Sequence, residues 1–170
     1  MARLLVAVFL IAVSATTLLD AKAPTVKIAI TSPDQTAAIE IVDASVREFH
    51  IWAGPGVGSN GIPQTEGFIA DWGKGRIAEP PKALRRYRIA FYTGCDPRDA
   101  SCTTEPQLSY VVTYVYDATA GRGYVYLPGK GEPSYELNTR SIARNGLEGN
   151  WFLASASWQS FITPILSPAR

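Results

Sequence analysis

His50 is the only histidine in the chain, so a catalytic triad or a histidine-based zinc site would have to use it. A Ser-His-Asp triad needs a histidine base, and zinc sites usually combine several His or Cys ligands. The side chain is flanked by Phe49 and Ile51, a setting typical of a partly buried structural histidine, and the sequence contains no G-x-S-x-G elbow. We therefore predict no catalytic residue, no metal and no cofactor.

Paired carboxylates are the second candidate, because glycoside hydrolysis uses two acidic side chains with unlike pKa values. Glu132 lies near Glu136 in the sequence, and Glu40 lies near Asp43. Among 15 acidic residues such pairs arise by chance, and acidic side chains are usually exposed. We interpret them as solvated surface. A small secreted hydrolase, using His50 or a carboxylate near residues 52–72, is the alternative function.

Gly56, Gly58 and Gly61 match the G-x-G-x-x-G spacing that brings backbone amides close to a pyrophosphate. The match follows Pro55 rather than a strand, and Pro63 interrupts the helix that the motif requires. We therefore interpret this stretch as turns within a loop.

Tyrosine is the residue type with an unusual distribution. The predicted ligand-binding residues are six of the eight tyrosines and one arginine: Arg88, Tyr92, Tyr110, Tyr114, Tyr116, Tyr124 and Tyr126. They share one face if Tyr116 pairs with Tyr124, Tyr114 with Tyr126, Tyr92 with Tyr110, and Arg88 with Tyr114. Tyrosines offer rigid apolar area and a hydroxyl, which suit a sugar, peptide or protein ligand. The alternative is that this face is covered and belongs to the core, because tyrosine also has a high strand propensity.

Three strands between Arg86 and Leu127 must position these side chains, because apolar residues alternate along them. The face opposite the tyrosines is predicted to be aliphatic: Ile89, Phe91, Val111, Val115, Val125 and Leu127. Near the C terminus, Trp158, Phe161, Ile162 and Ile165 have helical spacing. We expect this helix to pack on the aliphatic face and to end or kink near Thr163, before Pro164.

The remaining segments complete a single α+β domain over residues 24–170. It has a mainly antiparallel sheet, made of a meander (86–127) and an N-terminal hairpin (25–42), with the C-terminal helix packed on one face. Asp43 is predicted to cap a short helix. The long loop 53–75 is expected to fold back over the body, with Trp72 as an anchor. Tyr135–Leu137 is read as a short strand followed by a helix capped by Asn138, and Trp151–Leu153 as a core segment of undetermined type.

The N terminus has the pattern of an export signal: Arg3, then an apolar run over residues 4–13, then small residues. We predict a signal peptide over residues 1–15, possibly to 23, and a secreted or periplasmic protein. The apolar run is too short to span a bilayer. Cys95 and Cys102, with six residues between them, are then predicted to form a disulfide, because export places them in an oxidising compartment.

The net charge of the chain and the distribution of its basic residues indicate which classes of partner it can bind. The formal net charge is +1, and the predicted leader holds one more basic than acidic residue, so the remainder is neutral. Nucleic acids and anionic membranes need clustered Lys and Arg, but the one tight cluster here is Arg85, Arg86 and Arg88. We therefore predict a non-catalytic binding or interaction domain for an unknown small ligand, glycan or protein, with no nucleic acid partner and no membrane span after signal removal.

Overall fold

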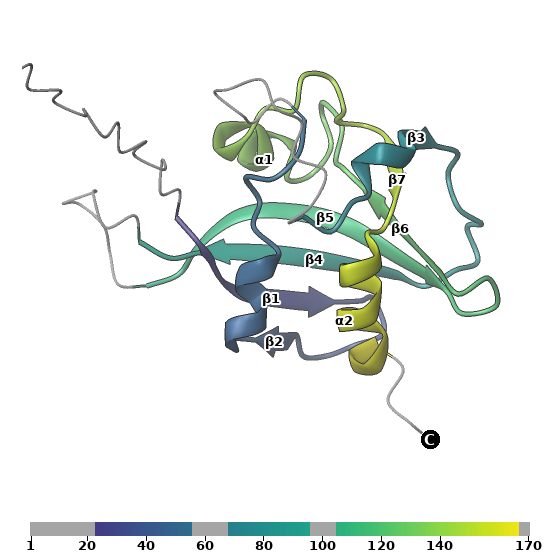
Figure 1. The fold of residues 1–170 in the computed structure, drawn as a ribbon, viewed down its shortest axis with the longest axis horizontal. Helices are drawn as coiled ribbons and strands as arrows, with labels where there is room; N and C mark the ends of the chain where they lie inside the picture. Colours follow the sequence, from purple (N-terminus) through teal and green to yellow (C-terminus); the bar gives the residue numbers. More distant parts are fainter. Residues whose placement is uncertain (1–22, 56–67, 96–104, 167–170) are drawn as a thin grey trace, which may run out of the picture.

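The computed structural model describes residues 23–55, 68–95 and 105–166, which form one α+β domain around a single sheet (Figure 1). Its elements in chain order are β1 (Thr25–Thr31), β2 (Ile39–Ile41), the 3-10 helices η1 (Ala44–Glu48) and η2 (Trp72–Lys74), β3 (Arg76–Ile77), β4 (Arg86–Thr93), β5 (Gln107–Asp117), β6 (Arg122–Tyr126), α1 (Tyr135–Ser141), β7 (Trp151–Leu153) and α2 (Ala156–Leu166). Along these described ranges, no helix has the length and apolar character needed to cross a membrane.

The sheet has seven strands in the order β2-β1-β4-β5-β6-β7-β3, and every pairing is antiparallel. The predicted meander forms its centre. The predicted hairpin joins the meander because β1 pairs with β4 on one side and with β2 on the other. Trp151–Leu153 is strand β7, which pairs with β6 and with β3. The predicted antiparallel sheet is therefore confirmed and extended by two strands.

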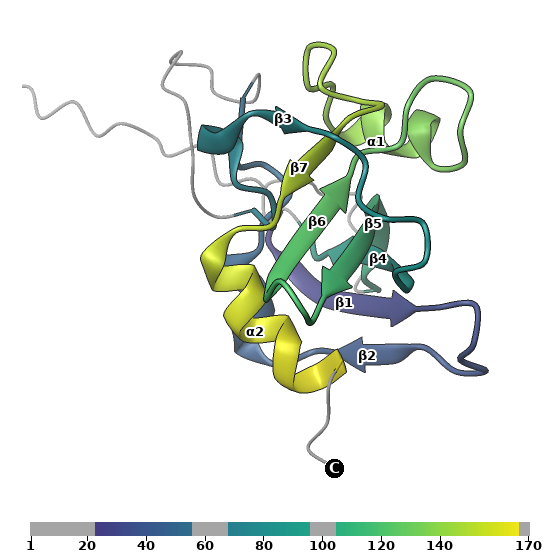
Figure 2. The same ribbon diagram turned by 90° about the vertical axis from the view of Figure 1, so that its right-hand side faces the viewer.

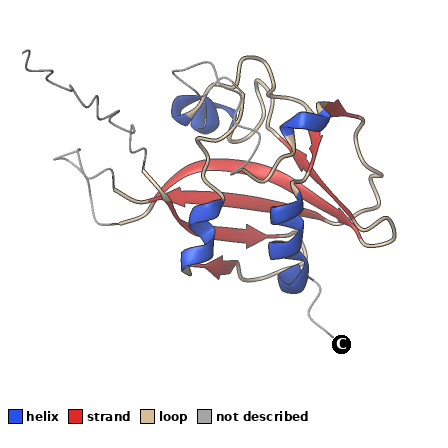
Figure 3. Ribbon diagram, viewed as in Figure 1, coloured by secondary structure: helices blue, strands red, loops and turns tan. Residues whose placement is uncertain are grey.

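Helices cover both sides of the sheet. Figure 2 shows α2 on one side and α1 on the other, and in Figure 3 η1 and α2 lie side by side across β1, β2 and β4. Asp43 caps η1 as predicted, since its carboxylate accepts a hydrogen bond from the Ser45 amide at 2.9 Å. Trp158 of α2 is fully buried, with its ring 5.0 Å from Phe49 and 5.9 Å from Tyr114. The C-terminal helix therefore packs on the sheet, as predicted.

The helix α2 continues through Pro164 to Leu166 instead of ending near Thr163. A proline removes one backbone donor, so the carbonyl four residues earlier, that of Ser160, loses its partner. Ser160 is exposed, so water can take the place of that donor. The helix ends within a turn after Pro164, so the cost stays local.

The predicted register of the meander is wrong by one residue in both hairpins, and by two at Tyr92, which follows a register shift after Phe91 and pairs with Leu108. Tyr114 pairs with Val125 and with Tyr87, and Tyr116 pairs with Gly123. Asp117 remains in the ladder and accepts hydrogen bonds from the amides of Thr119 and Ala120 at 2.9 and 3.1 Å, which closes a tighter turn than predicted. A one-residue shift moves every side chain of a strand to the other face.

As a consequence, tyrosines and aliphatic residues share the core face. Tyr87, Ile89, Phe91, Tyr110, Val112, Tyr114, Val125 and Leu127 are buried there, beneath α2. Val111 and Val115, predicted for this face, are also buried but lie on the other side of β5, because they pair with Ala90 and Tyr124.

The segment predicted as a strand over Tyr135–Leu137 is the first part of α1, and Asn138 lies inside this helix rather than at its cap. Residues before Thr113 have no partner in β6, so the backbone groups of Val111 on that side need other partners. The Asn138 side chain supplies them: it accepts from the Val111 amide at 2.8 Å and donates to the Val111 carbonyl at 2.7 Å. This pairing docks α1 on the sheet.

The described part of the long loop packs on the core as predicted, with Trp72 as an anchor. Its ring is stacked 5.7 Å from the Phe68 ring and meets the Phe152 ring edge to face at 5.1 Å. Arg144, which carries no signal in the sequence, is fully buried with its guanidinium 4.9 Å from the Trp72 ring. Arg144 donates to the carbonyls of Ile51 and Ala53 at 2.5 and 2.8 Å, so a buried cation ties the loop to the sheet.

Candidate functional site

The seven predicted binding residues do not lie on one face. Tyr110 and Tyr114 are fully buried beneath α2, and Tyr116 packs at the edge of the same core. The Tyr110 hydroxyl accepts a hydrogen bond from Nε of Arg144 at 3.1 Å, and burial raises its pKa. The Tyr114 hydroxyl is buried without a partner among the described residues. These tyrosines are core residues, which corrects the prediction of a continuous tyrosine face.

The other four predicted residues lie on the opposite face of the sheet. Tyr126 pairs with Thr113, Tyr124 with Val115, and Arg88 with Thr113. Tyr92 is half-buried beside the apolar contact between the sheet and α1, with Nζ of Lys27 4.2 Å from its ring centre. Of the four, Arg88 and Tyr126 line a hollow.

This hollow has a volume of about 630 Å³ and crosses β4, β5 and β6 on the face opposite α2. Its size is in the range of small-ligand sites. Arg86, Arg88, Val111, Thr113 and Tyr126 come from the strands, while Ser32 and Pro33 follow β1 and Pro128, Glu132, Pro133 and Ser134 precede α1. We call it the Arg88 hollow.

The register places one row of polar side chains across its floor. Thr31 of β1 pairs with Arg88 of β4, Arg88 pairs with Thr113 of β5, and Thr113 pairs with Tyr126 of β6. Paired residues point to the same side of a sheet, about 5 Å apart from strand to strand. Residues with hydroxyl groups, Thr31 and Thr113, therefore flank Arg88 on both neighbouring strands.

The two arginines of the hollow differ in their partners. Nη2 of Arg86 lies 2.8 Å from Oε1 of Glu79, and its guanidinium lies 5.2 Å from the Trp151 ring centre. The Arg88 side chain is exposed and makes no hydrogen bond, ion pair or ring contact with any described residue. The positive charge of Arg86 is therefore already compensated, and that of Arg88 is open to a ligand.

Glu132 is held in place on the far side of the row. Its Oε2 accepts from the Gly129 amide at 2.7 Å and from the Tyr126 hydroxyl at 2.8 Å. Burial, together with this bond to a carboxylate, raises the pKa of Tyr126 to about 12. Oε1 of Glu132 has no partner among the described residues.

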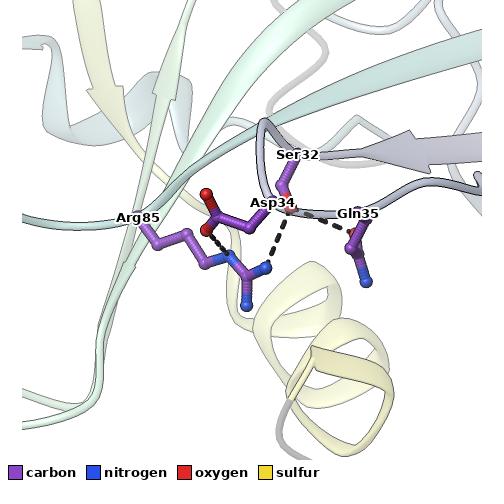
Figure 4. Close-up of polar contacts among 4 residues, drawn as sticks. All are labelled: Ser32, Asp34, Gln35 and Arg85. Atoms are coloured by element: carbon purple, nitrogen blue, oxygen red, sulfur yellow. Dashed lines mark hydrogen bonds and ion pairs between the residues drawn. The ribbon is translucent and has the colours of Figure 1, made fainter.

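The wall after β1 is fixed by a polar network shown in Figure 4. Nε of Arg85 lies 3.2 Å from Oδ2 of Asp34, and its Nη2 donates to the Ser32 hydroxyl at 3.1 Å. That hydroxyl donates to Gln35 at 3.2 Å. The network holds the β1–β2 turn against the start of β4. Exposed contacts of this kind add little stability, so their effect is to position Ser32 and Pro33.

The opposite wall contains strained backbone. Ser134, at the start of α1, has φ 72°, a left-handed conformation that costs a residue with a Cβ about 1 kcal/mol. Pro133 precedes it and Pro128 lies nearby. Both prolines restrict the backbone, so this wall is preorganised.

The other candidates for chemistry lie elsewhere. His50 is half-buried outside the Arg88 hollow, without a side-chain hydrogen bond to any described residue, and burial lowers its pKa. Glu40 pairs with Lys27 on the surface, at 3.0 Å. Within the described ranges, no group of three or more His, Cys, Asp or Glu side chains is placed to hold a metal ion.

Gly56, Gly58, Gly61 and Cys102 lie outside the described residues, so the predicted disulfide of Cys95 stays a prediction.

Comparison with models of protein families, with curated proteins and with solved structures finds no match to this chain. The site must therefore be interpreted from its own geometry.

Two residues of the Arg88 hollow were noticed in the sequence, but not as members of a binding site. Arg86 belongs to the basic cluster and Glu132 to a carboxylate pair. Glu132 is close to Glu136 in the sequence, but nothing in the sequence indicates its hydrogen bond with Tyr126. Thr31 and Thr113 alternate with apolar residues and carry no separate signal. Correct register across three strand pairs is needed to bring them together.

Proposed function

We propose that this chain is an exported, non-catalytic binding domain that takes a small polar ligand into the Arg88 hollow. The observation that carries the proposal is the contrast between its two arginines: Arg86 is paired with Glu79, whereas Arg88 is unpaired on the floor of a preorganised hollow. A guanidinium offers five donors in a fixed plane and recognises carboxylates in a bidentate manner. A ligand with an anionic group would give Arg88 the partner that the protein does not supply.

The residues that surround Arg88 in the hollow support the binding of a ligand rather than simple hydration of the guanidinium. The strained Ser134 and the network around Ser32 define both walls before a ligand arrives, which lowers the entropic cost of association. Thr31 and Thr113 provide hydroxyls beside Arg88, which would orient a polar ligand. The apolar share of the lining comes from Val111 and the prolines.

The test is a titration followed by amide NMR with a panel of neutral sugars, sugar acids and short peptides. We expect at least one anionic compound to shift the amides of Thr113 and Tyr126. The variant Arg88→Gln should weaken that binding about tenfold or more, because it removes a charge-assisted contact. Arg122→Gln is the matched control, since Arg122 is exposed at the start of β6 and does not line the hollow.

Two results would overturn the proposal. If no compound of the panel shifts the amides that line the hollow, the hollow is not a binding site for such ligands. If Arg88→Gln, with an unchanged melting temperature, binds as tightly as the parent protein, then Arg88 is not the anchor.

A further inference from the structure

The Arg88 hollow carries opposite charges on its two sides. Arg88 presents an unpaired cation from β4, and Glu132 presents Oε1 of a carboxylate beyond β6. Oε2 of the same carboxylate is fully engaged by the Gly129 amide and the Tyr126 hydroxyl. The carboxylate is thereby fixed, and one of its oxygens is free to accept a hydrogen bond from a ligand.

The charge balance around the hollow favours a ligand without net charge. Arg86 and Glu79 compensate each other at 2.8 Å. What remains for a ligand is one positive charge, on Arg88, and one negative charge, on Glu132. A simple anion would satisfy Arg88 but would be repelled by Glu132, whereas a zwitterion is attracted by both.

The spacing between the strands that carry Arg88 and Tyr126, whose hydroxyl holds Glu132, sets the size of the zwitterion. Arg88 and Tyr126 are separated by two strand spacings, about 10 Å between their Cα atoms. An extended chain spans about 3.5 Å per residue, so three residues cover that distance. The ammonium and carboxylate of a single amino acid, attached to one carbon, are too close together to reach both sides.

The middle of the row suits a peptide backbone. Thr113 lies between Arg88 and Tyr126, and its hydroxyl makes no hydrogen bond to any described residue. It is able to donate to a peptide carbonyl or to accept from a peptide amide. Val111 and the prolines of the lining would contact small apolar side chains.

We infer that the ligand is a short peptide of about three residues with free ends, bound with its carboxylate on Arg88 and its ammonium on Glu132. This inference rests on the proposed function and adds the chemical class and the direction of the ligand. A free carboxylate alone would also be offered by the C terminus of a protein, so the role of the ammonium separates the two sources.

The experiment compares three probes by isothermal titration and amide NMR: trialanine, N-acetyl-trialanine and trialanine amide. Each is titrated into the parent protein and the variants Arg88→Gln, Glu132→Gln and Arg122→Gln. We expect trialanine to bind the parent and Arg122→Gln equally, and each cap to weaken binding about tenfold. Glu132→Gln keeps an acceptor for Tyr126 and Gly129, and its melting temperature shows whether the loop is intact.

The decisive result is which substitution weakens the binding of which peptide. The acetylated peptide should bind parent and Glu132→Gln alike, because the group that Glu132 recognises is gone. The amidated peptide should likewise be insensitive to Arg88→Gln. If N-acetyl-trialanine binds as well as trialanine, the ligand is a plain carboxylate and the zwitterion is wrong. If the peptides fail while a sugar acid shifts the same amides, the peptide is wrong and the binding function stands. If nothing shifts them, both proposals fail.

Discussion

Gly54 allows the closest approach between the loop backbone and the buried aromatic cluster. Its φ is 119°, and a Cβ at this position would lie 2.5 Å from Nε1 of Trp72 and 2.7 Å from Nη1 of Arg144. We expect Gly54→Ala to lower the free energy of unfolding by about 3 kcal/mol, because it adds both backbone strain and overlap with buried groups.

Chemical denaturation measures this loss, and Gly131→Ala is the matched control. Gly131 has φ 86°, but nothing lies within 4 Å of its Cβ position. The control should therefore show backbone strain alone, about 1 kcal/mol. Equal losses in the two variants would mean that Gly54 is not packed against Trp72 as described.

His50 gives the protein a pH dependence that is simple to isolate, because it is the only histidine. Burial lowers its pKa below the ordinary value of 6.5, so the unfolded chain binds a proton more readily than the folded chain. Stability from this group is complete above pH 6.5 and is lost as the pH falls through the lower pKa of the folded state.

The variant His50→Gln should lack this contribution. The difference in the free energy of unfolding between the parent protein and the variant, measured by denaturation at several pH values, should be constant above pH 7 and should fall below pH 6. A difference that does not change with pH would show that His50 titrates alike in both states.

At the scale of elements, Asn138 is the residue that docks α1. Replacing it with Ala would leave the amide and carbonyl of the buried Val111 without partners. We expect Asn138→Ala to cost about 3 kcal/mol, since each unsatisfied buried group costs about 1–3 kcal/mol. Thr139→Ala on the same helix removes a hydroxyl shared between the carbonyls of Tyr135 and Glu136, at 3.0 and 3.5 Å, and should cost under about 1 kcal/mol.

Both losses are read from urea denaturation, and hydrogen exchange adds a local measurement. In Asn138→Ala the amide of Val111 should exchange faster than the amide of its neighbour Val112. If Val111 stays equally protected, another group must pair with it.

Element types were predicted more successfully than their pairing. Alternation of apolar residues located β1, β4, β5 and β6, and helical spacing located α2. The register of β5 depends on the turn that begins at Asp117. The Asp117 carboxylate accepts hydrogen bonds from two amides of this turn, and Gly121 has a positive φ, so the loop is one residue shorter than predicted. Turn geometry of this kind is weakly encoded locally, and the error moved three tyrosines to the wrong face.

At the scale of the whole molecule, the export signal and the cysteine pair make one joint prediction. If Cys95 and Cys102 are paired as predicted, unfolded but unreduced protein, purified from the secreted or periplasmic fraction, should show no free thiol in a thiol assay. Reduction should lower the free energy of unfolding by about 2.5 kcal/mol, the loop-closure contribution of an eight-residue loop. Detection of two free thiols would show that the pair, or the compartment, is wrong.

The sequence alone determined the class of the fold, since alternation and helical spacing are local patterns that burial imposes on a strand or a helix. Only the tertiary structure decided which side chains share a face, and that Tyr110 belongs to the core while Tyr126 faces the Arg88 hollow. The physical reason is that the faces of a sheet depend on register, and register depends on one residue in a turn. The partners of a charge also come from elements distant in the chain, so only the tertiary structure shows that Arg144 is buried with partners and that the Arg88 side chain has none among the described residues.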